Sequence, residues 1–218
     1  MDLRALIDHT LLKPDATSDA VELLCAEALD FGFASVCVNP CRVPLASEKL
    51  RGSRVAVCSV VGFPLGATSS DAKLAEAGWC LANGASEIDA VMNIGDAKEG
   101  NWSCVEEEMK RLAETVHAQD AILKVILETC LLDKSEIVEA CERAVAAGAD
   151  FVKTSTGFAG GGATVEDVGL MAATVSGRCL VKASGGIKTR SDALALVEAG
   201  AARIGTSSGI AIAGEPRS

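Results

Sequence analysis

Several residue types on which many enzymes depend are scarce or missing in this chain of 218 residues. Tyr is absent, there are two His, and aromatic residues make up 3% of the sequence. With so few imidazoles a histidine-rich catalytic metal site is not expected. No apolar run reaches the ~20 residues that span a membrane, and the opening MDLRALID is too charged and short for a secretory signal. We therefore predict a cytoplasmic protein without a metal.

Positive charge is also in short supply, because 20 Lys and Arg stand against 30 Asp and Glu for a net charge of -10. Nucleic acid is not an expected partner, since its phosphate backbone needs a positive surface. A small anion is not excluded, because a local site can hold one in an acidic protein. Cys37, Cys58 and Cys179 lie in apolar runs where free Cys acts as a small hydrophobe, so we expect reduced thiols and no disulfides.

What the sequence has in abundance is an alternation of apolar strand-like and helix-like segments. Eight strands are predicted, at 6–11, 34–39, 54–62, 87–93, 122–128, at the start of 149–158, at 179–183 and at 203–207. Helices are predicted at 18–31, 70–83, 105–118, 134–147, 165–175 and 191–199. This pattern favours an α/β fold, a single-domain (β/α)8 TIM barrel over residues 1–218. A doubly wound sheet is the alternative, but no Gly-x-Gly-x-x-Gly follows an early strand.

Three of the apolar strands are interrupted by a lysine. Lys124, Lys153 and Lys182 are each 29 residues from the next, and Asp89 holds the equivalent place in its own strand. A lone lysine more often ends a strand and reaches water. Three lysines and an aspartate at matched heights would instead meet near the barrel mouth, where neighbouring cations lower each other's pKa. An uncharged amine of this kind is a nucleophile toward carbonyls, so the set predicts Schiff-base chemistry.

Small-residue turns follow the last two strands, at Ser184-Gly185-Gly186 and at Gly205–Gly209. Loops at these positions of a barrel commonly bind phosphate through backbone N–H groups and hydroxyls. Either turn alone is a common feature of loops, but together they predict an anion site that Thr156 and Gly157 would border.

Other polar residues are given less weight. Cys37 is expected to be a packed thiol rather than a nucleophile, and Glu128 to pair with Lys124. Asp8 and Thr10 either line the mouth or cap a helix. Solvated positions are expected for His117 and for the acidic first helical turn at 106–108.

Eight segments together resemble one family, the deoxyribose-phosphate aldolases of class I, over nearly the whole chain. They are DHTLLKP (8–14), SVCVNP (35–40), VVGFPLGAT (60–68), EIDAVMNIG (87–95), LKVILETCLL (123–132), ADFVKTSTGF (149–158), VKASGGIKT (181–189) and RIGTSSG (203–209). The pair KTSTG and KASGG is the most specific feature. The resemblance implies a barrel without metal or organic cofactor that interconverts 2-deoxy-D-ribose 5-phosphate with acetaldehyde and D-glyceraldehyde 3-phosphate.

By the same resemblance, Lys153 matches the Schiff-base lysine, Lys182 the lysine beside it, and Asp89 the aspartate of proton transfer. The phosphate-binding positions carry over to Gly185, Gly186, Ser207 and Ser208, and less firmly to Thr156. Two departures stand out, since Phe158 replaces a lysine that some members have, and the tail IAIAGEPRS is short and lacks Tyr.

Three rival functions stay open at this point. Another lysine aldolase or a transaldolase would use the same barrel and a different aldehyde. A sugar-phosphate-binding protein without turnover would keep the glycine turns but would not need paired strand lysines. A thiol-redox role would rest on the nine cysteines. The expected partners are a phosphorylated sugar and aldehydes, with a homodimer or larger homo-oligomer as the assembly.

Overall fold

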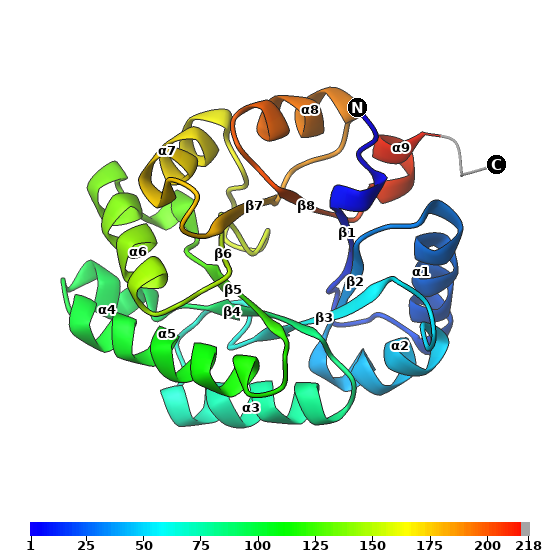
Figure 1. The fold of residues 1–218 in the computed structure, drawn as a ribbon, viewed down its shortest axis with the longest axis horizontal. Helices are drawn as coiled ribbons and strands as arrows, with labels where there is room; N and C mark the ends of the chain where they lie inside the picture. Colours follow the sequence, from blue (N-terminus) through cyan, green and yellow to red (C-terminus); the bar gives the residue numbers. More distant parts are fainter. Residues whose placement is uncertain (215–218) are drawn as a thin grey trace.

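A closed barrel of eight parallel strands forms the centre of the computed structural model, which describes residues 1–214 (Figure 1). The strands are β1 Ile7–Leu11, β2 Ser35–Val38, β3 Ala56–Val61, β4 Glu87–Val91, β5 Ile122–Ile126, β6 Phe151–Lys153, β7 Leu180–Ser184 and β8 Arg203–Thr206. Each strand pairs with the next, and β1 closes on β8 with Ile7 opposite Ile204. The predicted barrel is confirmed, and closure rules out the open sheet. The last four residues of the predicted domain, 215–218, lie outside the described part.

Helices surround the barrel on its outer face (Figure 1). They are α1 Ser18–Phe31, α2 Val43–Lys49, α3 Ser70–Ala82, α4 Ile94–Lys98, α5 Trp102–His117, α6 Lys134–Ala146, α7 Val165–Val175, α8 Arg190–Glu198 and α9 Gly209–Ala213. Three 3-10 turns, η1 Arg4–Leu6, η2 Pro40–Arg42 and η3 Thr129–Leu131, complete the described elements. Within residues 1–214, none of the helices has the length and apolar character needed to cross a membrane.

Local sequence signals explain where the long helices begin and end. The Thr17 side chain accepts a hydrogen bond from the Ala20 N–H, and Gly32 ends α1 at a φ of 67° that glycine adopts without strain. Thr17 is therefore the cap, and Ser18 is the first helical residue. At α6, Asp133 and Glu136 form a reciprocal capping box.

Short helices were the elements that periodicity missed. No helix was predicted at α2, α4 or α9. Helix α5 begins at Trp102 rather than 105, which moves the acidic run out of its first turn. One member of that run, Glu108, is buried against Lys73 with 2.6 Å between Nζ and Oε1. The prediction that all three acidic residues are solvated is therefore wrong for Glu108.

Strand alternation divides the barrel into two environments. On β4, Ile88 and Ala90 belong to the hydrophobic core between sheet and helices. Glu87 and Asp89 alternate with them and are also buried, but they point the other way, into the barrel lumen, where both pair with Lys124. The fold thus encloses charged side chains and holds them away from water.

Candidate active site

Strand register decides which lumen residues face one another. Asp89 lies opposite Lys124, and Lys153 lies opposite Lys182, whereas Lys124 lies opposite Phe151, two residues before Lys153. The expectation that equal spacing places all three lysines at one height is therefore wrong for Lys124. The stagger between β5 and β6, rather than the repeat length, sets its level.

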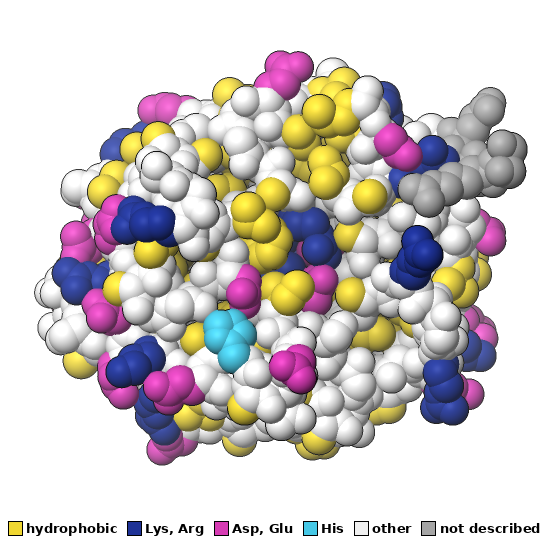
Figure 2. Space-filling view, viewed as in Figure 1, with side chains coloured by type: hydrophobic (Ala, Val, Ile, Leu, Met, Phe, Trp, Pro, Cys, Tyr) yellow, Lys and Arg dark blue, Asp and Glu magenta, His cyan; other side chains and the backbone are white. Residues whose placement is uncertain are grey.

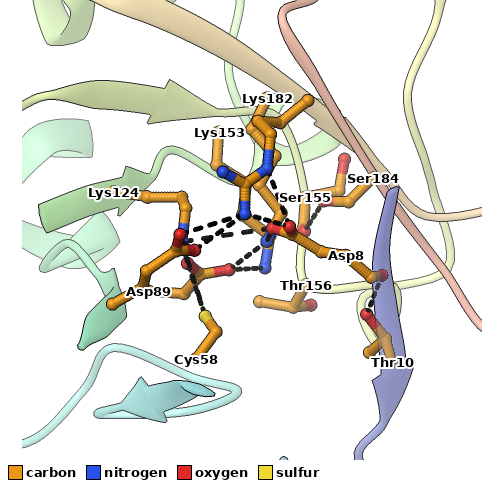
Figure 3. Close-up of polar contacts among 12 residues, drawn as sticks. Asp8, Thr10, Cys58, Asp89, Lys124, Lys153, Ser155, Thr156, Lys182 and Ser184 are labelled. Carbon is orange, nitrogen blue, oxygen red and sulfur yellow. Dashed lines mark hydrogen bonds and ion pairs between the residues drawn. The ribbon is translucent and has the colours of Figure 1, made fainter. Parts of the chain in front are cut away.

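The long lysine side chains nevertheless converge on one carboxylate (Figure 3). Lys124 Nζ lies 2.9 Å from Asp89 Oδ1, and Oδ2 accepts from Lys153 Nζ at 2.6 Å and Lys182 Nζ at 2.7 Å. All four residues are buried. The structure therefore brings together the three predicted catalytic residues, with Lys124 as a fourth member. Their chemical roles stay predictions.

Further ion pairs extend this cluster toward the other strands. Asp8 lies in the lumen, with its Oδ2 2.5 Å from Lys182 Nζ, and its Oδ1 accepts from Arg203 Nε at 2.8 Å. Glu87 Oε2 lies 2.6 Å from Lys124 Nζ and 2.9 Å from Arg203 Nη2. Asp8 was expected to line the mouth or to cap a helix, and it instead lies buried deeper in the lumen. Glu87 and Arg203 were missed, although the alternation of Glu87 with apolar residues would have placed it beside Asp89.

The charges of this cluster stabilise each other. Burial by itself would lower the pKa of Lys182, but Asp8 and Asp89 outweigh it and hold that pKa above its usual value. The pKa of Lys124 is raised in the same way, because the effect of burial is outweighed by nearby anionic groups, mainly Asp89. Burial would raise the pKa of Asp89, and the three lysines instead hold it well below its usual range. Lys124 does lower the pKa of Lys182, as expected, but the carboxylate partners outweigh this effect, so neither Lys124 nor Lys182 has the lowered pKa that was expected.

The predicted pairing of Glu128 with Lys124 is also wrong. Glu128 has a positive φ of 58°, uncommon for a residue other than glycine, and its carboxylate turns toward the loop after β6. It accepts hydrogen bonds from the Thr156 N–H, at 3.2 Å from Oε1, and from the Thr156 hydroxyl. That hydroxyl accepts in turn from the Phe158 N–H at 3.0 Å. Glu128 thereby fixes the orientation of Thr156.

A cavity of about 300 Å³ opens above the cluster, and Lys153 lines it. The cavity lies where the strands end; the space-filling view shows the opposite end of the barrel, where basic, acidic and apolar side chains gather near the centre (Figure 2). The other predicted residues that line the cavity are Thr10, Thr156, Gly157, Gly185, Gly186 and Ser207. Its wall is completed by Leu11, Leu12, Lys13, Phe158, Ser184, Ile187, Lys188, Gly205 and Thr206. Among residues 1–214, Ser208 is the predicted anion-binding residue that does not line it.

Glycine conformation shapes one side of this cavity. Gly185 and Gly186 have φ values of 87° and 77°, which disfavour any side chain. The loop before α7 packs directly on this turn, since the Ala163 N–H donates to Ser184 O at 3.0 Å and to Gly185 O at 3.1 Å. A Cβ built on Gly162 would lie 2.3 Å from Gly185 O. The two loops are therefore in backbone contact.

Two buried thiols lie below the cavity. Cys58 Sγ is 3.2 Å from Asp89 Oδ1, and the ligand atoms of Cys37, Cys58 and Asp89 lie within 4.8 Å of one another. These three residues do not fit a metal site, because three ammonium groups already occupy the carboxylate and would repel a cation. Elsewhere, His117 is not simply solvated as predicted, since its Nε2 lies 2.9 Å from Asp150 Oδ2.

Comparison with known proteins assigns this barrel to a class of aldolases. The profile of the DeoC/LacD family aldolases matches residues 3–214, and the chain belongs to that family. A relative from Carboxydothermus hydrogenoformans, named deoxyribose-phosphate aldolase, is 54% identical over 95% of this chain and 92% of its own. A relative of the same name from Brevibacillus brevis is 53% identical over 97% of this chain and 95% of its own.

Solved structures of aldolases superpose closely on this fold. The deoxyribose phosphate aldolase from Aeropyrum pernix, described as tetrameric, has a TM-score of 0.91 and is 37% identical, over 97% of this chain and 89% of its own. Another solved aldolase has a TM-score of 0.93 and is 44% identical, over 98% of this chain and 95% of its own. The family resemblance stated from the motifs is confirmed.

Proposed function

We propose that this protein is an aldehyde-lyase that reversibly cleaves 2-deoxy-D-ribose 5-phosphate into D-glyceraldehyde 3-phosphate and acetaldehyde through a Schiff base on Lys153. The observation that carries the proposal is the position of this amine. Among the three strand lysines of the described chain, Lys153 is the one that lines the cavity, and its Nζ lies 2.6 Å from Asp89 Oδ2. The family membership and the curated relatives' names support the same substrate.

The chemistry begins with addition of the uncharged Lys153 amine to C1 of the open-chain sugar, and loss of water gives an iminium ion. A base then takes the proton of the C3 hydroxyl, the C2–C3 bond breaks, and its electron pair is held as an enamine. Glyceraldehyde 3-phosphate leaves as that hydroxyl becomes its aldehyde. Protonation of C2 and hydrolysis of the iminium release acetaldehyde and the free amine.

Asp89 and Lys182 support these proton transfers. Asp89 is ionised and can accept a proton, and Lys182 is a cation that donates to the same oxygen as Lys153 at 2.7 Å. We propose that the sugar is oriented by the end of the cavity that binds its phosphate. There Gly185, Gly186 and Ser207 offer backbone N–H groups and a hydroxyl. Ser208 stays a prediction as a second hydroxyl at this end.

The direct test couples cleavage of deoxyribose 5-phosphate to detection of the triose, with a chelator present throughout. Borohydride added with substrate is expected to leave a reduced adduct on the peptide that contains Lys153 and no other. No triose, or an adduct on another lysine, would overturn the proposal. Turnover of a different phosphorylated or unphosphorylated aldehyde in place of this sugar would favour another aldolase or a transaldolase.

Two coarser proposals accompany this one. We propose that the chain forms a homo-oligomer, because a family member of known structure is described as tetrameric, and light scattering on the purified protein tests it. We also propose a cytoplasmic location in deoxyribose phosphate catabolism, since all nine cysteines are free thiols. Cell fractionation with an antibody against the chain tests the location.

A further inference from the structure

The lumen charges form a closed ring in which anions and cations alternate. Following the ion pairs from strand to strand gives Asp8, Lys182, Asp89, Lys124, Glu87, Arg203 and Asp8 again. Three carboxylates face three cations, and each carboxylate lies between two cations. The ring is therefore balanced in charge.

Lys153 is a seventh charge attached to this balanced ring. Within residues 1–214, Asp89 is the one carboxylate within 4 Å of its Nζ, and the same Oδ2 atom already accepts from Lys182. When Lys153 is protonated, the lumen holds four cations and three carboxylates. Loss of a proton from Lys153 removes that excess and leaves every ring ion pair intact.

We infer that Glu87 and Arg203 are positioning residues that set the protonation state of Lys153 through the charge of the ring. This inference rests on the proposed function. Both lie at the starts of their strands, whereas Lys153 ends β6, so neither contacts the cavity directly among the residues described. Their influence is electrostatic, and it acts in an interior where water screens charges less than at the surface.

Titratable groups reach the lumen from every strand. Besides Lys153 they are Asp8 (β1), Cys37 (β2), Cys58 (β3), Glu87 and Asp89 (β4), Lys124 (β5), Lys182 (β7) and Arg203 (β8), with Lys13 and Lys188 across the cavity. Of these groups, only Glu87 and Arg203 change in the variants compared below. All the other groups are common to every variant, so a difference between two variants reports on ring charge.

Opposite substitutions should displace the pH profile in opposite directions. In Arg203→Gln the three carboxylates face Lys124, Lys182 and Lys153, so Lys153 loses its proton less easily. The acid limb, which is the low-pH side of the plot of kcat/KM against pH, should then move up by about one pH unit. In Glu87→Gln the cations exceed the carboxylates further, so Lys153 loses its proton more easily and the limb moves down by a similar amount. A merely structural role would lower activity without displacing the limb.

Pulse acetylation of Lys153 with acetic anhydride, followed by peptide mass spectrometry, measures the uncharged amine without turnover. The same two displacements are expected in this reaction. Glu108→Gln is the matched control, because it neutralises a buried carboxylate that pairs with a buried lysine outside the lumen, and its profile should match the wild type. Arg203→Lys keeps the charge and should also keep the profile.

The double variant Glu87→Gln/Arg203→Gln covers the case in which a single variant does not fold. It keeps the ring neutral and is expected to keep the wild-type acid limb. Shifts of the same sign in both single variants, no shift in a folded single variant, or a displaced limb in the double variant would overturn the inference. A wild-type protein that neither cleaves the sugar nor traps it on Lys153 would instead show that the proposed function is wrong.

Discussion

Gly162→Ala is a demanding test of how the cavity is built, because the added methyl group has no space. Its Cβ would lie 2.3 Å from Gly185 O and 2.6 Å from Gly185 C. The first distance is about 1 Å shorter than an ordinary carbon–oxygen contact. Both neighbours are backbone atoms, so no side-chain rotation relieves the contact, and the turn at Gly185 must move. Overpacking of this kind costs about 1–3 kcal/mol of stability.

The kinetic effect should exceed the effect on stability. A shift of about 1 Å in the turn that is proposed to hold the phosphate should lower kcat/KM for deoxyribose 5-phosphate by roughly 10²-fold. Unphosphorylated deoxyribose does not use the turn, so its slower cleavage should fall far less. The assay is steady-state kinetics on both sugars, with a thermal melt to confirm folding.

A control lies a few residues further along the same segment. A Cβ on Gly169, within α7, meets no atom within 4 Å. Gly169→Ala should therefore leave both sugars' kinetics unchanged and stabilise the helix by about 0.5–1 kcal/mol. Wild-type kcat/KM for the phosphorylated sugar in a folded Gly162→Ala protein would refute the reasoning, since the two loops would then not depend on each other.

Three further predictions concern single groups. Lys153→Leu should reduce turnover by roughly three orders of magnitude or more and abolish borohydride labelling, yet melt near the wild-type temperature because the ring stays balanced; a large loss of Tm would contradict this. Asp89 has a lowered pKa, so its stabilising effect is present above about pH 4 and is lost as pH falls, by up to about 1.4 kcal/mol per pH unit in urea unfolding. Equal stability at pH 5 and pH 3 would count against it. The exposed thiols of Cys41 and Cys104 should react at once with a disulfide reagent, whereas Cys141, whose burial raises its pKa to about 12, should need denaturant.

Much of the site followed from the sequence, because a lysine inside an apolar strand has few places to go. Lys153, Lys182 and Asp89 interrupt runs of buried residues, and the lumen is the one polar interior that a barrel offers them. Glu87 and Arg203 were missed since both begin a strand, where a charged residue ordinarily reaches water. Their burial depends on partners brought together by barrel closure.

Strand register and the short helices could not be predicted from the pattern of apolar residues. The level of Lys124 depends on the stagger between two strands, which no spacing along the chain encodes. Glu108 looked like a solvated residue because its partner, Lys73, lies 35 residues away on another helix. Helices of five to seven residues, such as α2 and α9, are too short to show a helical period.

The contact between Asp8 and Arg203 joins residues 195 positions apart in sequence. During synthesis on a ribosome, the carboxylate of the first strand emerges long before the guanidinium that will neutralise it. A nascent chain lacking β8 thus cannot complete the ring of ion pairs, because that carboxylate then has Lys182 but not its other ring partner, Arg203. Final assembly waits for the eighth strand, so the last step of folding is also the step that completes the electrostatic interior.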